Sequence, residues 1–362
     1  MKGAGRVAVA MSGGVDSSVA AALLKEQGYD VFGVSLRVFD PDSCRQAGER
    51  SCCSAEDIRD ARRVAAHLDI PFSSWDVRSE FDDQVIRPFA EEYLRGRTPN
   101  PCILCNSRIK YRLLLEKVEE TGARWLATGH YAGVVGREGA FSLVRSADSA
   151  KDQTYFLFEI GAAVLPRILF PLAGMTKEEV RLRAADLGLP VAAKAESQEI
   201  CFVPGNDYGA FLKGRLPKEA VAPGPVVNAK GRRLGTHRGL IHYTVGQRRG
   251  LGIAAGSPLY VTRIDRENNT VVVGGDGDLR RKSFRVCRTT WLEVPRTEEF
   301  RAEVKIRNRH PQSPATVLPL GGPDCRVEFD EAQRAVTPGQ AAVFYEGDTV
   351  LGGGWIDDIE AD

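Results

Sequence analysis

The sequence has no long apolar run and no low-complexity or repetitive segment. Its first apolar stretch, Val7–Met11, is broken at once by Ser12-Gly13-Gly14, so it is too short for a signal-sequence core or a membrane span and is typical of a buried strand. Apolar residues make up 43% and charged residues 27% of the chain, which excludes intrinsic disorder. Because 362 residues exceed one typical core, we expect a soluble protein of two or three domains. Because the first apolar run is too short for a signal sequence or a membrane span, we expect the protein to stay in the cytoplasm.

The chain also lacks an excess of charge of either sign. A formal net charge of +1 neither favours nor excludes a nucleic-acid partner, because a basic face can exist on a neutral protein. Basic clusters that fit contact with phosphates occur at Arg232-Arg233, at Arg248-Arg249 and at Lys305, Arg307 and Arg309. Charge runs usually only solvate a surface, so these clusters alone leave RNA contact open.

Short β-rich runs alternate with helical periodicity from Arg6 to about Leu126. The alternation predicts βαβ units, and right-handed crossovers would wind them into a doubly wound parallel sheet. The predicted strands are 7–11, 31–36, 72–77 and 124–128, and the predicted helices are 16–27, one opening at Ser54 and Asp57, and 107–120. Thr176 and Glu179 predict a capping box on a further helix that stops near Gly188.

The composition changes in the second half of the chain. From Pro223 onward, turn signals separate short alternating runs at 259–264, 270–273, 302–306 and 341–345. These runs predict two small β-rich modules with a boundary near Arg281. We therefore expect three domains, at 1–205, 206–281 and 282–362.

A glycine–serine loop joins the first predicted strand to the first predicted helix. In Ser12-Gly13-Gly14-Val15-Asp16-Ser17-Ser18, glycines allow close backbone approach, and N–H groups, hydroxyls and the positive helix end can hold an anion. The sequence has neither the Gly-Lys-Ser/Thr of the Walker loop nor the spaced glycines of the dinucleotide fingerprint. The alternative is an ordinary turn in which Ser and Asp only cap the helix.

The loop resembles the PP-loop of ATP pyrophosphatases, which cleave ATP between the α and β phosphates and leave AMP on a substrate oxygen. The resemblance implies that the loop cradles pyrophosphate and that Asp16 helps to hold Mg²⁺. This superfamily includes synthetases and tRNA-modifying enzymes, so the loop alone does not name the substrate.

Eight cysteines without secretory features indicate reduced thiols, metal ligation or catalysis rather than a disulfide framework. A turn made rigid by Pro99 and Pro101 delivers Cys102 and Cys105 to the start of a predicted helix, where the thiolate form is favoured. Cys201 stands in a loop-rich stretch far away in sequence. On spacing alone, the first two cysteines also fit a metal or redox pair, and Cys201 also fits a buried apolar position.

The other cysteines carry weaker signals. Cys44, Cys52 and Cys53 fit no zinc spacing, and we expect them in a loop near the nucleotide site without a chemical role. Cys287 and Cys325 fall in β-rich runs and are predicted to pack in a core.

Further motifs follow the phosphate loop along nearly the whole chain. They are GRTPNP at 96–101, TGHY at 128–131, KDQ at 151–153, SQEIC at 197–201, VGQRRG at 245–250 and TPGQ at 337–340. Together they resemble the bacterial tRNA-specific 2-thiouridylases, a family of PP-loop enzymes. The resemblance implies an α/β PP-loop domain of the adenine nucleotide alpha hydrolase-like type, a small central β-rich domain that contacts tRNA and a C-terminal β-barrel-like domain.

The resemblance also implies a reaction. ATP would adenylate the position-2 oxygen of the wobble uridine, tRNA position 34, and a persulfide on Cys201 would replace that oxygen with sulfur, giving 2-thiouridine, AMP and pyrophosphate. Cys105 would release the product by forming a disulfide with Cys201. Two alternatives remain open: sulfide released between these cysteines, and an iron–sulfur cluster on Cys102, Cys105 and Cys201. The second arises because some relatives carry Asp in place of Cys102.

Binding residues follow from the same resemblance. ATP would contact Ala10, Met11, Ser12, Gly13, Gly14, Val15, Asp16, Ser17, Leu36 and Gly129. The target base would contact Asn100, Pro101 and Cys102. The tRNA would also contact Lys151, Asp152, Gln153, Arg307 and Asn308. The family more usually has an aromatic residue where Asn308 stands.

His130 and Gln340 match positions regarded as important in the family, although His130 also fits a structural turn histidine. A cysteine desulfurase or a persulfide relay protein would donate the sulfur. A PP-loop synthetase for small molecules and a non-catalytic tRNA binder are the rival functions. The first gives no reason for the paired cysteines, and the second gives none for an intact phosphate loop.

Overall fold

The computed structural model describes residues 5–39, 55–137, 139–196, 200–203, 205, 207–217, 221–293 and 296–357. The chain forms two compact units. Unit 1 comprises residues 1–85, 102–206 and 348–350, and unit 2 comprises residues 86–101, 207–347 and 351–362. Two predictions lie outside the described residues: the placement of Cys44, Cys52 and Cys53 near the nucleotide site, and the helix cap at Ser54.

Unit 1 is built on a five-stranded sheet in the order β3-β2-β1-β4-β7, with parallel neighbours throughout. The strands are β1 (Arg6–Ala10), β2 (Asp30–Arg37), β3 (Phe72–Asp76), β4 (Trp125–Thr128) and β7 (Ile168–Leu169). The order steps from β1 to β2 and β3 on one side and then returns to β4 on the other. The carboxyl ends of β1 and β4 therefore meet at the switch point, where ligands bind in open α/β sheets.

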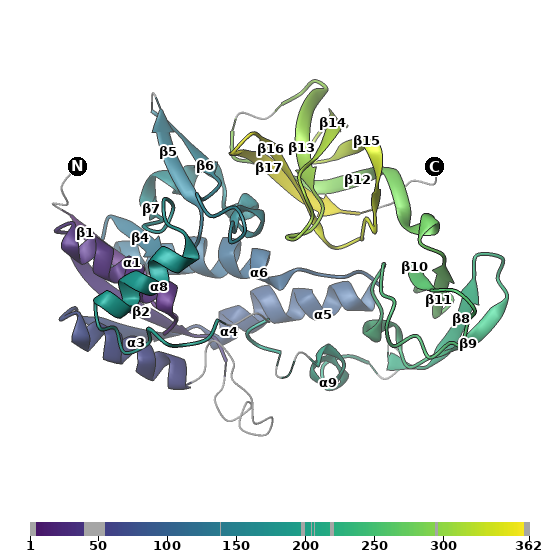
Figure 1. Ribbon diagram of the computed structural model, residues 1–362, viewed down its shortest axis with the longest axis horizontal. Helices are drawn as coiled ribbons and strands as arrows, with labels where there is room; N and C mark the ends of the chain where they lie inside the picture. Colours follow the sequence, from purple (N-terminus) through teal and green to yellow (C-terminus); the bar gives the residue numbers. More distant parts are fainter. Residues whose placement is uncertain are drawn as a thin grey trace. The chain divides into compact units, whose positions relative to one another are not determined.

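Helices α1 (Val15–Glu26), α3 (Ala55–His67) and α8 (Lys177–Asp186) cover one face of this sheet. Figure 1 shows α1 and α8 side by side, and they pack directly on each other. The return crossover from β3 to β4 contains α4 (Arg78–Phe81), α6 (Pro101–Leu104), the π-helix η2 (Cys105–Leu114) and α7 (Leu115–Glu120). Because right-handed crossovers in opposite directions lie on opposite faces, this crossover covers the second face. The expected doubly wound sheet is confirmed.

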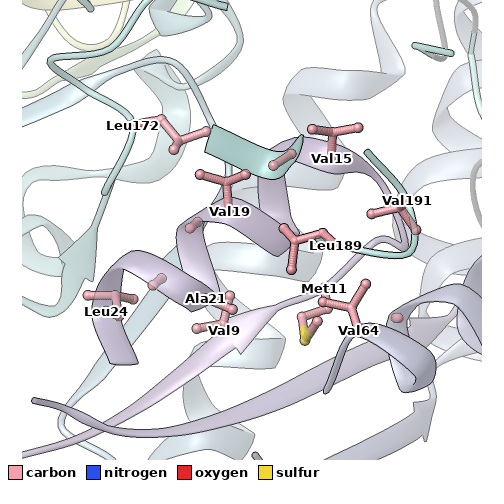
Figure 2. Close-up of a cluster of buried hydrophobic side chains, with 14 of the residues drawn as sticks. Val9, Met11, Val15, Val19, Ala21, Leu24, Val64, Leu172, Leu189 and Val191 are labelled. Atoms are coloured by element: carbon pink, nitrogen blue, oxygen red, sulfur yellow. The ribbon is translucent and has the colours of Figure 1, made fainter. Parts of the chain in front are cut away.

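The core of unit 1 fills the space between the sheet and its first helical layer. Alternate residues of β1 and the residue after it, Val7, Val9 and Met11, point to that layer, because successive strand side chains face opposite sides. They meet Val19 of α1 and Val64 of α3, both fully buried (Figure 2). This packing fixes where β1 ends and therefore where the loop to α1 begins.

Two helix boundaries follow the sequence closely. Gly28 has φ +83° just after α1, a conformation that residues with a Cβ rarely adopt, so the helix stops there. The capping box on α8 is confirmed, since the Thr176 hydroxyl accepts from the Glu179 N–H and the Glu179 carboxylate accepts from the Thr176 N–H. Gly188, at φ +59°, follows the end of α8 as expected.

Unit 2 contains a four-stranded sheet and a closed barrel. The sheet has the order β10-β11-β8-β9, from strands Tyr260–Asp265, Thr270–Gly274, Gly224–Asn228 and Arg233–His237. The barrel has six strands in the order β12-β15-β14-β13-β16-β17, and pairing between β12 and β17 closes it. These strands are β12 (Arg280–Trp291), β13 (Phe300–Lys305), β14 (Ser313–Pro319), β15 (Cys325–Arg334), β16 (Ala341–Glu346) and β17 (Thr349–Ile356). The expected β-rich second half is confirmed.

Some elements were not anticipated from the sequence. Unit 1 has a hairpin of β5 (Gly133–Arg137) and β6 (Ala140–Val144), and unit 2 includes helix α5 (Arg87–Leu94), whose Phe89 packs on Phe211 of α9 (Tyr208–Lys213). Short 3-10 segments make up much of 154–167. Among the described helices, none is long and apolar enough to cross a membrane.

Replacing Leu24 with alanine should destabilise unit 1. Leu24 is 2% exposed in the core of Figure 2, so Leu24→Ala leaves a cavity and should lower the free energy of unfolding by about 2–5 kcal/mol. Urea unfolding followed by tryptophan fluorescence measures this. Leu182→Ala on α8 is the control, since Leu182 is 60% exposed and its loss should change stability by less than about 0.5 kcal/mol. Equal unfolding midpoints for the two variants would contradict this account of the core.

Candidate functional site

The loop after β1 is shaped by its backbone. Met11 buries its side chain in the core while Ser12 is exposed. Gly13 has φ +72°, and a Cβ there would lie 2.2 Å from the Asp57 carbonyl oxygen, so only glycine fits. Gly14 is the N-cap of α1 and has no side chain that could occupy the first-turn N–H groups. The loop therefore presents donors and the positive end of α1 to an anion.

The serine hydroxyls brace this loop from inside. Ser17 and Ser18 both donate to the Gly14 carbonyl, at 3.2 and 2.8 Å. The Ser12 N–H donates to the Ser17 hydroxyl oxygen at 3.2 Å. Ser17 and Ser18 are buried, so they hold the turn, and Ser12 is the hydroxyl that reaches solvent.

Gly129 follows β4 and lies directly against the start of α1. A Cβ at Gly129 would meet the Ser17 nitrogen at 2.5 Å and the Asp16 carbonyl carbon at 2.6 Å. The structure therefore brings Gly129 to the phosphate loop, as the switch-point geometry requires. Leu36 lies near the end of β2, where it pairs with Trp75, and it is partly exposed. It lies two residues beyond Val34, the β2 partner of Ala10 at the end of β1.

The Asp16 carboxylate, in the first turn of α1, contacts a lysine and a tyrosine. Its two carboxylate oxygens accept from the Lys177 ammonium at 2.7 and 2.8 Å, and one also accepts from the Tyr131 hydroxyl at 3.0 Å. Lys177 is the first residue of α8, so the packing of α1 on α8 creates this pair. Nothing in the local sequence pattern marked Lys177, because the contact joins residues far apart in the chain.

Lys194 holds the outer side of the loop. Its ammonium donates to the Gly13 carbonyl at 3.0 Å and to the carboxylates of Asp57 and Asp60, each at 2.6 Å. Burial tends to lower the pKa of Lys194, but the hydrogen bonds to these carboxylates outweigh it and raise the pKa. Lys194 is therefore a permanent cation beside the loop, and sequence reasoning missed it.

The predicted tRNA-contact segment 151–153 is divided by the structure. Lys151 reaches outward and donates to Glu196 at 2.8 Å, whereas the Gln153 amide oxygen accepts from the Tyr131 N–H at 2.9 Å. The Asp152 side chain is only 1% exposed, and its carboxylate accepts from Thr154. Direct contact of the Asp152 side chain with RNA does not fit this conformation, because the carboxylate is enclosed by its own segment.

His130 is a neutral, partly buried histidine that contacts the buried side chains of Thr128 and Tyr111. Its Nδ1 lies 2.7 Å from the Thr128 hydroxyl and 3.0 Å from the Tyr111 hydroxyl, and its Nε2 lies 3.4 Å from the Lys110 ammonium. An ammonium can only donate, so Nε2 accepts and Nδ1 carries the proton. Burial, and secondly Lys110, hold the pKa of His130 well below its usual value. His130 thus joins β4 to η2 without carrying charge.

The first two predicted cysteines lie where the sequence places them. Pro101 opens α6, a position that suits proline, and Cys102 is exposed while Cys105 is partly exposed at the start of η2. The next residue, Asn106, is buried and donates to the Phe156 carbonyl at 3.0 Å. Asn106 therefore fixes the helix turn that presents Cys105.

Cys201 is partly exposed and belongs to the same unit. Its neighbour Phe202 is buried and packs edge-on against Phe81 of α4, with ring centroids 5.5 Å apart. Because α4 also packs on η2, one short helix supports both elements that carry the predicted working thiols. Ser197, Gln198 and Glu199 of the same motif lie outside the described residues.

The GRTPNP turn is held within unit 2. Gln340 donates to the Thr98 carbonyl at 2.9 Å, and Thr98 donates its N–H to the Pro338 carbonyl at 2.9 Å. Gly339 has φ +88°, and a Cβ there would lie 3.0 Å from Thr98 backbone atoms. Gln340 therefore positions the backbone two residues before Asn100.

The remaining predicted residues are placed as follows. Arg307 and Asn308 are half-buried in the turn after β13, and Arg307 donates to the Arg334 carbonyl at 3.3 Å. Cys325 is buried in the barrel core, as expected, and burial raises the pKa of its thiol to about 11. Within the ranges that the structure describes, no group of three or more His, Cys, Asp or Glu side chains could hold a metal ion.

The fold and site define an adenine-nucleotide enzyme of the PP-loop type with two appended β modules. The family models that match are "tRNA methyl transferase HUP domain" over residues 5–205, "tRNA methyl transferase PRC-barrel domain" over 209–275 and "Aminomethyltransferase beta-barrel domain" over 281–356.

The most informative relatives carry one name. The chain is 52% identical over 356 residues to "tRNA-specific 2-thiouridylase MnmA" of Geobacter metallireducens, covering 97% of this chain and 96% of that one. It is 49% identical to the protein of that name from Moorella thermoacetica, with 97% and 99% covered. This chain belongs to the tRNA-specific 2-thiouridylase family.

Solved structures are more distant. "Crystal structure of a 4-thiouridine synthetase - RNA complex with bound ATP" aligns with a TM-score of 0.37 at 19% identity, over 59% of this chain and 50% of that one. A likeness at this level adds nothing to the assignment.

Substituting Gly129 with alanine should weaken ATP binding. The added Cβ would collide with backbone atoms of Ser17 and Asp16, so the loop must shift, and we expect ATP affinity to fall roughly tenfold or more. Calorimetric titration with ATP measures this. Gly174→Ala is the matched control, because a Cβ there meets nothing within 4 Å. Unchanged ATP affinity in Gly129→Ala would show that the loop tolerates the shift.

Removing the Gln340 amide should loosen the GRTPNP turn while leaving ATP binding intact. Gln340→Ala leaves the Thr98 carbonyl without this donor, at a cost of about 1–3 kcal/mol locally. Hydrogen exchange should then accelerate at the amides of Thr98 and Asn100. Gln340→Glu, which keeps the shape but cannot donate from that oxygen, should behave the same way. Unaltered exchange in both variants would show that the contact between Gln340 and Thr98 does not hold the turn.

Proposed function

We propose that this protein replaces the position-2 oxygen of the wobble uridine, tRNA position 34, with sulfur in an ATP-dependent reaction. The observation that carries the proposal is the presence, in one compact unit, of the phosphate loop and of both elements that bear Cys105 and Cys201. Relatives named for this activity, at about half identity over 97% of the chain, support it.

Adenylation is the first step. The uridine position-2 oxygen attacks the α-phosphorus of ATP, the bond to the bridging oxygen of the β phosphate breaks, and pyrophosphate leaves. N–H groups of the loop and the positive end of α1 stabilise the charge that develops on pyrophosphate. Asp16 would hold Mg²⁺ together with phosphate oxygens, since that ion takes both kinds of ligand, and the ion would supply further neutralisation.

Sulfur transfer follows. The terminal sulfur of a Cys201 persulfide attacks uridine C2, and AMP leaves with the original oxygen. The Cys105 thiolate then attacks the Cys201 sulfur, so that the S–S bond to the base breaks and a Cys105–Cys201 disulfide forms. A thiol reductant must return the disulfide to two thiols, and a persulfide donor, either a cysteine desulfurase or a relay protein, must reload Cys201.

Substrate contacts complete the proposal. ATP contacts residues 10–17, Leu36 and Gly129. The target base contacts Asn100, Pro101 and Cys102, as expected for a single-stranded nucleotide turned into a pocket. Lys151, Gln153, Arg307 and Asn308 contact the tRNA elsewhere. The cytoplasm, where we expect this protein, supplies the tRNA.

A cysteine series tests the two-thiol route. Cys105→Ser and Cys201→Ser should abolish 2-thiouridine formation, because each removes a sulfur that must form or break a bond, whereas Cys102→Ser should keep at least about a tenth of the rate. Mass spectrometry of digested tRNA measures the product, after anaerobic purification with iron analysis.

Pyrophosphate release provides the control. All three variants should still release pyrophosphate only when tRNA is present, since adenylation precedes the sulfur steps. Loss of thiolation in all three, with stoichiometric iron, would instead favour the cluster. A small-molecule synthetase would need another substrate in order to release pyrophosphate, and a non-catalytic binder would release none.

A further inference from the structure

One carboxylate beside the phosphate loop is surrounded by cations. Glu196 accepts from Lys151 at 2.8 Å, lies 3.1 Å from the Lys177 ammonium and 3.6 Å from the Arg181 guanidinium. The Glu196 side chain is 26% exposed, so these cations meet it at the edge of the protein interior. The hydrogen bond from Lys151, opposed by burial and reinforced by Lys177, lowers the pKa of Glu196 to about 2. Glu196 is therefore an anion at every physiological pH.

One of these cations, Lys177, adjoins the loop that holds phosphates. Lys177, only 11% exposed, binds Asp16 in the first turn of α1 and also lies 5.8 Å from the Tyr131 ring centroid. A lysine of such low exposure needs anionic partners, because a buried ammonium without them is costly. Lys177 thus links the loop to the Glu196 position through a single charged group.

The charges of this cluster suit a larger anion than one carboxylate. Glu196 supplies one negative charge, whereas Lys151, Lys177 and Arg181 supply three positive charges around it. The carboxylates of Asp16 and Asp148 also contact Lys177, through its ammonium and its N–H. Pyrophosphate in the loop would bring several oxygens that prefer these same donors, since phosphate oxygens form strong hydrogen bonds with Lys and Arg. Glu196 and a phosphate group cannot both be fully bound by them.

We propose that Glu196 is an internal competitor of pyrophosphate: it occupies the cationic subsite of Lys151, Lys177 and Arg181 until a nucleotide or pyrophosphate displaces it. The inference rests on the proposed function in assigning the loop to the β and γ phosphates. It assigns Lys177 to the leaving group and adds a phosphate contact to Lys151. It also explains how cations beside an unliganded loop remain neutralised.

The competition also helps product release. Glu196 can pair again with Lys151, Lys177 and Arg181 as pyrophosphate departs, so these cations regain an anionic partner. Binding of pyrophosphate is weakened by the fraction of molecules in which Glu196 holds the cations. Removing the carboxylate should therefore tighten binding.

Calorimetric titration of the full-length protein with inorganic pyrophosphate, without tRNA or a sulfur donor, tests this proposal. Glu196→Gln should bind pyrophosphate roughly tenfold more tightly than the unsubstituted protein, as expected when a competitor engaged about nine-tenths of the time is removed. Glu178→Gln is the matched control, because it removes one negative charge from an exposed position on α8 and should leave the affinity unchanged. Equal affinity in Glu196→Gln and Glu178→Gln would overturn the proposal.

Substitution of Lys177 should have the opposite effect on pyrophosphate binding. Lys177→Met should weaken pyrophosphate binding roughly tenfold or more, and Lys177→Arg should retain most of it, because the charge is kept. Circular dichroism checks that Lys177→Met is folded, and Lys177→Arg answers the question if it is not. Full pyrophosphate affinity in a folded Lys177→Met, or a large loss of affinity in Lys177→Arg, would refute the subsite.

The two proposals can fail separately. If Glu196→Gln tightens pyrophosphate binding while tRNA gains no sulfur, the proposed function fails and the subsite stands. If tRNA is thiolated and Glu196→Gln binds pyrophosphate like the unsubstituted protein, only the competitor is wrong.

Discussion

The phosphate loop depends on one ammonium group that joins three parts of the chain. Lys194 contacts the loop at Gly13 and helix α3 at Asp57 and Asp60, while itself belonging to the segment that leads to Cys201. Both carboxylates are largely buried, with Asp57 13% and Asp60 7% exposed, and so is the loop backbone at Gly13. Without this cation, two carboxylates of one helix turn would repel each other behind the site. The ion pairs of Lys194 therefore hold the loop in the conformation that presents N–H donors to an anion.

Much of the fold follows from local chemistry in the sequence. The strand–loop–helix at residues 6–26, the capping box at Thr176 and the stops at Gly28 and Gly188 all depend on neighbouring residues, so propensity and spacing predicted them. Alternation and turn signals predicted β10 and β11 of the four-stranded sheet and β13 and β16 of the barrel. The hairpin of β5 and β6 and helix α5 were missed, because short or mixed segments take their structure from what they pack against.

The site divides in the same way. A few adjacent residues were enough to predict two parts of the site: the glycine–serine loop and the proline-containing turn before Cys102. The local sequence does not mark Lys177, Lys194 or Glu196. The role of each depends on contacts with residues up to 181 positions away. The family resemblance marked Gln340 as important without giving a physical reason. The hydrogen bond from Gln340 to the Thr98 carbonyl gives one. The resemblance also suggested tRNA contact for Asp152, whose carboxylate is enclosed.

The contact between Gln340 and Thr98 has a consequence for how the chain is made. The two residues are 242 positions apart, so the ribosome completes the phosphate loop and the cysteine-bearing turn long before the residues that brace that turn. A nascent chain can already have its nucleotide loop while the turn before Asn100 still lacks its support. The barrel is therefore made after the turn that it braces, and exchanging it for an unrelated module would remove that support.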